Sequence, residues 1–166
     1  MKFITAAAIV VFVLAAALTA QGPRGEYKKL NFLTGSWKST SIKLDSGKES
    51  FGESKIQWII NDTWLQWRFT AQLESGPLEV LTLINYHEEK RQYAFYSFNP
   101  FDKQPLPHFG NWIKPNVLRL EIIEDGGKIA VDFILKGDGK FEQIHQKILP
   151  SGRTEIIRKT EYVRLK

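Results

Sequence analysis

The chain has 166 residues, which suits one domain rather than two. It contains no cysteine, and this excludes disulfides, thiolate metal sites and a cysteine nucleophile. The formal charge is +5, but Lys and Arg are scattered among Glu and Asp, so the charges indicate a solvated outer face. We therefore expect no nucleic-acid partner, and only weak attraction to anionic membrane surfaces.

Residues 1–20 have the pattern of an export signal. Lys2 precedes an apolar run from Phe3 to Ala20 that ends in small residues. Cleavage after Ala20 would leave a periplasmic or secreted protein, and export without cysteine favours a bacterial envelope. The run is also long enough to span a bilayer, so an uncleaved helix that tethers the protein is the alternative.

A polar lead over residues 21–29 precedes a single predicted domain, residues 30–166. The segment "LNFLTG" predicts one helical turn that Gly35 ends. Short apolar segments then alternate with turn-forming segments at regular intervals, and no linker divides them. The turn-forming segments are "DSGK" (45–48), "ND" (61–62), "ESGP" (74–77), "HEEK" (87–90), "EDGGK" (124–128), "GDG" (137–139) and "PSG" (150–152).

Strict alternation within these segments predicts strands with one dry face. In residues 64–73, Leu65, Trp67 and Phe69 share one face, while the residues between them are polar. A sheet of about nine or ten such strands needs a partner layer or closure, and closure removes both exposed edges. We predict an all-β fold, a closed up-and-down antiparallel barrel of about nine or ten strands. A two-layer β-sandwich is the alternative.

The segment from Phe98 to Trp112 breaks this rhythm. It contains three prolines together with Phe101, His108 and Phe109, and it is long and apolar for a hairpin loop. Two interpretations follow, a lid at the mouth of the barrel or a loop that packs over its end for stability.

Two positions predict how the barrel closes. Gly35 lets the chain turn sharply, so that Trp37 enters the barrel floor at the start of the first strand. Arg164 lies near the end of the last strand, which pairs with the first in a closed barrel. Its guanidinium could stack on the Trp37 ring and donate to carbonyls of the preceding segment.

The pairing of Gly-x-Trp with a terminal arginine resembles the calycin superfamily, which includes lipocalins and fatty-acid-binding proteins. More closely, "LNFLTGSW", "IQWIINDTWLQWRF", "INYHEEKRQYAFYSF" and "EYVRL" resemble an uncharacterised bacterial lipocalin-like family over roughly residues 28–166. The resemblance implies a closed antiparallel barrel with an internal pocket and no established activity.

The nitrobindin-like barrels, a sister group, bind haem through a histidine on a late strand. This sequence departs from that pattern, because the strand after Arg153 has no histidine. His145 lies one strand earlier and shares a face with Gln143 and Lys147, which predicts exposure to solvent unless a bulge shifts the phase. Haem binding is therefore disfavoured, and we predict no cofactor and no metal site.

The last strand suggests what the interior could bind. If Arg164 points toward Trp37, alternation turns Tyr162, Thr160, Arg158 and Ile156 inward, and Arg158 with Tyr162 could receive a ligand carboxylate. A bulge that turns Ile157 inward and Arg158 outward is the alternative. The predicted ligand-binding residues are Trp58, Trp67, Phe69, Phe133, Leu135, Arg158, Tyr162 and His108, with Gly35, Trp37 and Arg164 closing the barrel.

These features predict an exported barrel that carries or sequesters a small apolar or amphipathic molecule. Two alternatives stay open. A barrel filled by its own aromatic side chains would bind a protein or envelope component through its outer surface. An enzyme would need facing titratable groups, and no catalytic signature such as Gly-x-Ser-x-Gly or His-Glu-x-x-His occurs.

Overall fold

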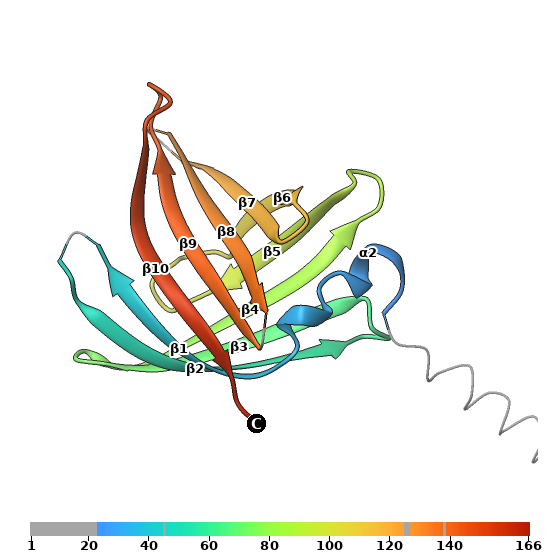
Figure 1. Cartoon of the computed structure of the whole chain (residues 1–166), viewed down its shortest axis with the longest axis horizontal. Coiled ribbons are helices and arrows are strands. Elements are labelled where there is room, and N and C mark those ends of the chain that lie inside the picture. Colours follow the sequence, from blue (N-terminus) through green and yellow to red (C-terminus); the bar gives the residue numbers. More distant parts are fainter. Residues whose placement is uncertain (1–22, 45, 125–126, 138) are drawn as a thin grey trace, which may run out of the picture.

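A computed structural model describes residues 23–44, 46–124, 127–137 and 139–166 (Figure 1). Two short helical segments, α2 and η1, precede ten strands. The predicted signal peptide lies outside the described residues. No helix among the described residues is long and apolar enough to cross a bilayer. The elements are α2 (Gly25–Lys28), η1 (Asn31–Leu33), β1 (Gly35–Lys43), β2 (Glu49–Ile59), β3 (Trp64–Leu73), β4 (Gly76–His87), β5 (Gln92–Phe98), β6 (Leu106–Lys114), β7 (Val117–Glu124), β8 (Gly127–Gly137), β9 (Lys140–Ile148) and β10 (Thr154–Arg164).

The ten strands form one closed antiparallel barrel. Each strand pairs with its neighbours in the sequence, and β1 also pairs with β10. In this last pairing Trp37 lies opposite Arg164. The predicted closed barrel is confirmed, and the two-layer sandwich is excluded.

Alternation explains why these segments form strands around one interior. On β3, Leu65 is 0% exposed and Trp67 is 6% exposed, whereas Arg68 between Trp67 and Phe69 is exposed. The turn before β3 is tight, because Asn61 and Asp62 both adopt positive φ, 53° and 60°. Asn and Asp tolerate this conformation better than most residues, so the chain reverses where the sequence predicts it.

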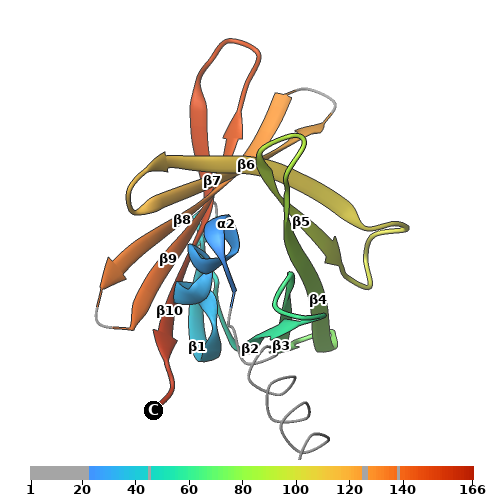
Figure 2. The ribbon, with the colours of Figure 1, turned by 90° about the vertical axis from the view of Figure 1, so that its right-hand side faces the viewer.

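One end of the barrel is filled by the helical segment and aromatic side chains. In Figure 2, α2 lies within the ring of strands. Leu30 and Leu33 from this segment are both 0% exposed. They belong to the same core cluster as Trp37 and Phe141, whose ring centroids are 4.8 Å apart. This half of the barrel is therefore filled by a hydrophobic core.

Hydrogen bonds from the strands hold the helical segment in place. The Tyr27 hydroxyl donates to the Tyr86 carbonyl at 3.0 Å, and the Tyr93 hydroxyl donates to the Glu26 carboxylate at 2.8 Å. Trp58 Nε1 donates to the Asn31 side chain at 2.8 Å. Because these bonds come from several strands, the segment acts as a fixed plug.

The contact expected to close the barrel is present. The Arg164 guanidinium lies over the Trp37 ring, 4.2 Å from its centroid, and also donates to the carbonyls of Phe32, at 3.0 Å, and Thr34. Trp37 Nε1 donates to the Leu33 carbonyl at 2.7 Å. Gly35 has a φ of 122°, and a Cβ there would lie 2.3 Å from Arg164 Nη1, so the close approach requires glycine.

The segment from Phe98 to Trp112 is not one long loop. β6 begins at Leu106 and pairs with β5, so that only residues 99–105 form a loop. Pro107 lies where β6 is paired on one side only, because the pairing of β6 with β7 begins at Phe109. The prediction that the whole segment forms one loop was therefore wrong, and the shorter loop lies at the mouth of the barrel.

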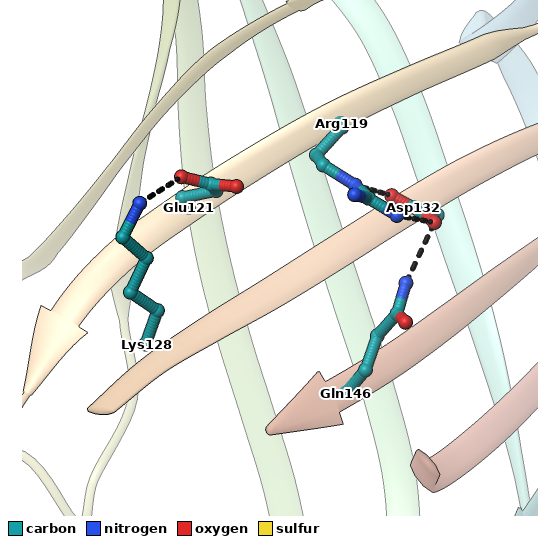
Figure 3. Close-up of polar contacts among 5 residues, drawn as sticks. All are labelled: Arg119, Glu121, Lys128, Asp132 and Gln146. Carbon is teal, nitrogen blue, oxygen red and sulfur yellow. Dashed lines mark hydrogen bonds and ion pairs between the residues drawn. The ribbon is translucent and has the colours of Figure 1, made fainter. Parts of the chain in front are cut away.

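A polar network joins three strands on the outer face (Figure 3). Asp132 on β8 is only 7% exposed. It accepts two hydrogen bonds from Arg119 on β7, both 2.7 Å, and one from Gln146 on β9, 2.6 Å. The hydrogen bonds to Asp132 raise the pKa of Arg119. A more exposed ion pair, Lys128 with Glu121, lies beside it at 3.2 Å.

Candidate ligand-binding cavity

The other half of the barrel is hollow. A cavity of about 660 Å³ lies between the aromatic core and the end opposite the plug. Its rim includes Lys43 and Lys48 beside the β1–β2 turn, Leu73 before the β3–β4 turn, and Phe101 of the 99–105 loop. This volume falls within the range of about 300–1,000 Å³ that small-molecule sites occupy. One alternative predicted a barrel filled by its own aromatic side chains. The cavity shows that this half of the interior is not filled.

Aromatic rings form the floor of the cavity. Trp67, Phe133 and Tyr162 line the cavity. On their other side, their rings contact Phe141 of the packed core. The Phe141 and Tyr162 rings are stacked, with centroids 4.3 Å apart and planes 7° apart. Burial raises the pKa of Tyr162, so its hydroxyl stays protonated and donates to the Gln143 side chain at 3.1 Å.

The cavity has a polar side built by three neighbouring strands. On β1, β10 and β9, inward residues pair in rows from floor to mouth. Thr160 lies between Ser41 and Gln143, and Arg158 lies between Lys43 and His145. The Thr160 hydroxyl donates to the Ser41 hydroxyl at 2.9 Å.

Next to β1, β2 contributes Glu49 and Ser50 to the lining; apolar walls lie beyond β2 on this side and directly beside β9 on the other. β7 and β8 contribute Leu120, Val131 and Phe133, and β3 contributes only apolar residues to the cavity. A smaller polar group, Thr82, Ser97 and His108, comes from β4, β5 and β6. The remaining apolar lining residues are Trp67, Phe69, Ala71, Leu73, Leu78, Val80, Phe95 and Phe101.

Arg158 keeps its place at the cavity mouth despite a bulge in β10. The register shifts between Ile156 and Arg158, so the bulge expected as an alternative does occur. It lies on the far side of Arg158, however, and turns Ile156 outward, where it is 42% exposed. The prediction for Ile156 was therefore wrong, whereas Arg158, Thr160 and Tyr162 all line the cavity. Within the described residues no carboxylate pairs with the Arg158 guanidinium.

His145 faces the cavity, and its predicted exposure to solvent was wrong. It shares its face with Gln143 and with Phe141, which is 0% exposed and fixes the phase of β9. Burial, together with the charges of Arg158 and His108, lowers the pKa of His145 to about 4. The imidazole is therefore neutral at physiological pH.

We expect His145 to make the protein sensitive to acid. Its pKa is lower in the folded state than the ordinary 6.5, so between these values the unfolded chain binds the extra proton. Stability should therefore fall by up to about 3 kcal/mol as the pH drops from about 6.5 to about 4. Urea unfolding across this range should show a flatter profile for His145→Gln. Parallel profiles would contradict a buried neutral imidazole.

Two predicted ligand-binding residues lie away from the cavity. Trp58 belongs to the plug end, where it contacts Tyr27 edge-to-face at 6.5 Å and bonds to Asn31. Leu135 lies opposite Phe141, near the β8–β9 turn at the same end. Their inward alternation was sound, but alternation does not show how deep along the barrel axis a residue lies. Trp67, Phe69, Phe133, Arg158, Tyr162 and His108 do line the cavity.

Sequence reasoning missed most of the polar side. Ser39, Ser41, Gln143 and His145 line the cavity but were not among the predicted ligand-binding residues. The parity of Phe141 was the available signal, because a large aromatic residue fixes which face of β9 is inward. Among the described residues, no three His, Asp or Glu side chains are grouped as a metal site would require.

The fold and the cavity define a class of protein. The chain is a closed ten-strand antiparallel barrel with a cavity in one half. No protein-family model matches it, and no curated protein matches it in sequence.

Several solved structures are similar in fold, and three of them serve as examples. Rv2717c from M. tuberculosis superposes with a TM-score of 0.61 at 12% identity, covering 87% of this chain and 99% of that chain. The S-type phycobiliprotein lyase CPES from Guillardia theta gives 0.51, also at 12% identity and with the same coverage. A redesigned β-barrel gives 0.50 at 13% identity, covering 86% of this chain and 100% of that chain.

Proposed function

We propose that this protein binds a small amphipathic carboxylic acid inside the barrel. The observation that carries the proposal is the cavity of about 660 Å³ with aromatic walls and Arg158 at its mouth. An apolar body would displace water from the aromatic walls, and the acid group would meet the guanidinium. The binding protein would act as a carrier or a scavenger, because the sequence offers no catalytic signature.

Replacing Arg158 by methionine tests the proposal. The variant keeps an unbranched apolar stem but removes the guanidinium and its charge. We expect about tenfold weaker binding of dodecanoate and unchanged binding of dodecanol, because a charge-assisted hydrogen bond contributes about 1.5 kcal/mol. Quenching of tryptophan fluorescence or isothermal titration calorimetry measures both affinities.

Lys159→Met is the matched control. Lys159 is the next residue on β10, faces outward and is also exposed, so this variant loses the same charge outside the cavity. It should bind dodecanoate as the unchanged protein does. Equal losses in both variants would mean that the charge acts at long range, and no loss in either would remove Arg158 from the site.

A second candidate is haem binding, supported by the neutral, half-buried His145 that faces the cavity. A neutral imidazole is a common axial ligand, and the aromatic walls would cover the porphyrin. Haem would supply redox or gas-binding chemistry, and His145 would hold the iron. Titration with hemin separates the candidates. A sharp Soret band that His145→Ala abolishes would favour haem, and its absence would leave the acid.

Export and family membership also belong to the proposal. We place the protein in the bacterial envelope, in the periplasm or outside the cell, because residues 1–20 have the pattern of a signal peptide. The calycin-like fold supports membership of the bacterial lipocalin-like family that the sequence motifs resemble. Intact-mass spectrometry of the protein from its own cells should give the mass of a chain that starts at Gln21, free or cyclised to pyroglutamate, and a chain that retains residues 1–20 would instead support the tethered form.

A further inference from the structure

The arrangement of polar groups in the cavity indicates the shape of the ligand. A ligand with one polar head and an apolar tail needs polar side chains only at the mouth. Here they continue from mouth to floor along β1, β10 and β9. The row of Arg158 is followed by the row of Thr160 and then by the paired Ser39 and Tyr162. Every residue that these three strands contribute to the cavity carries a polar group.

This polar stripe keeps hydrogen-bonding capacity for a ligand. Thr160 donates to Ser41, and Tyr162 donates to the carbonyl oxygen of the Gln143 amide. These two bonds do not use the hydroxyl proton of Ser41 or the amide protons of Gln143, so these donors can bond to a ligand. Polar groups left unpaired by an apolar ligand would cost free energy, so the stripe favours a ligand that bonds to it.

We propose that the ligand is facially amphipathic, an anion with hydroxyl or carbonyl groups along one long edge and an apolar opposite side. The polar edge would lie along the stripe formed by Ser39, Ser41, Gln143, Thr160 and Tyr162, and the acid group would reach Arg158. The apolar side would face the walls of β3 and β4 on one flank and β7 and β8 on the other. This inference rests on the proposed function and narrows its ligand class.

Two steroid acids that differ only in their polar edge test the inference. Cholate carries hydroxyl groups on one face of its ring system, and 5β-cholanate has the same rings and carboxylate without them. We expect cholate to bind at least about fivefold more tightly, although it is less hydrophobic. Isothermal titration calorimetry below the micellar concentrations measures both.

Variants of the stripe show where the difference arises. Thr160→Val and Gln143→Met keep side-chain size but remove polar groups, and each should weaken cholate binding about fivefold while leaving cholanate nearly unchanged. Phe69→Leu on the apolar wall is the matched control, and it should weaken both acids to the same degree. Thermal unfolding of each variant checks that the barrel is intact.

The outcomes separate the inference from the proposed function. If cholanate and dodecanoate bind and cholate binds no better than cholanate, the ligand is a head-and-tail acid. That result overturns the inference and leaves the proposed function standing. If none of the three acids binds to the folded protein, both fail. Preference for cholate that Thr160→Val removes supports both.

Discussion

Replacing Trp37 by alanine is expected to lower the free energy of unfolding by about 4 kcal/mol, the range for deleting a buried large aromatic side chain. Trp37 is 1% exposed, packs against Phe141 and donates to the Leu33 carbonyl. Its loss would leave a void between the plug and the cavity floor, and Arg164 would lose the ring beneath it. Urea unfolding followed by circular dichroism measures the change.

Trp58→Ala is the matched control for this prediction. Trp58 lies at the same end and also donates one hydrogen bond to the helical segment, but it is only partly buried. We expect a cost of about 2 kcal/mol, because less of the side chain leaves a void. Arg164→Met should cost about 1 kcal/mol alone and less in a Trp37→Ala background, where only its hydrogen bonds to the Phe32 and Thr34 carbonyls are left to lose. A larger cost for Trp58→Ala than for Trp37→Ala would contradict the central role of Trp37.

The barrel could be predicted from the sequence because its signals are local. A strand such as β3 shows its inward face through Leu65 and Trp67, and Asn61 with Asp62 marks the reversal before it. Closure joins residues far apart in the chain, yet Trp37 and Arg164 were enough to predict that the first and last strands pair. An inward arginine needs hydrogen-bond acceptors or a ring for its charge, and a buried tryptophan needs an acceptor for its N–H, so few partners fit either residue.

The polar stripe could not be predicted in this way. Alternation identifies the inward face only where inward residues are apolar, and on β9 the inward face carries Gln143 and His145. On a strand that lines a partly polar cavity, inward residues are polar, which is the reverse of the usual alternation. Phe141 was the correct guide to the phase of β9, because a large ring at 0% exposure cannot face water.

Backbone irregularities limited the prediction at two further places. The bulge beside Arg158 adds one residue to β10, and neither Ile156 nor Ile157 marks it, since any residue can occupy a bulge. The prolines near residue 105 suggested a long loop. Only the pairing of β5 with β6 shows that the strand resumes at Leu106.

The outer network centred on Asp132 links the stability of the barrel to the shape of the cavity. Gln146, which donates to Asp132, follows His145 on β9 and points the opposite way. By joining β7, β8 and β9 on the outside, the network holds the strand whose inner face carries Gln143 and His145. A variant that loosens it should therefore disturb both folding and binding.

Asp132→Ala is expected to cost about 3 kcal/mol, because it removes three hydrogen bonds to a nearly buried carboxylate and leaves Arg119 without its partner. Removing both charges in Asp132→Ala/Arg119→Met should cost less than the single change, since no partly buried cation is then left unpaired. Glu121→Ala, which breaks the neighbouring exposed pair, is the control and should cost less than about 0.5 kcal/mol. Urea unfolding of the unchanged protein, of the single variants Asp132→Ala, Arg119→Met and Glu121→Ala, and of the double variant measures these differences. If the double variant costs as much as both single changes added together, Arg119 and Asp132 act independently, and β9 must be held by its backbone pairing alone.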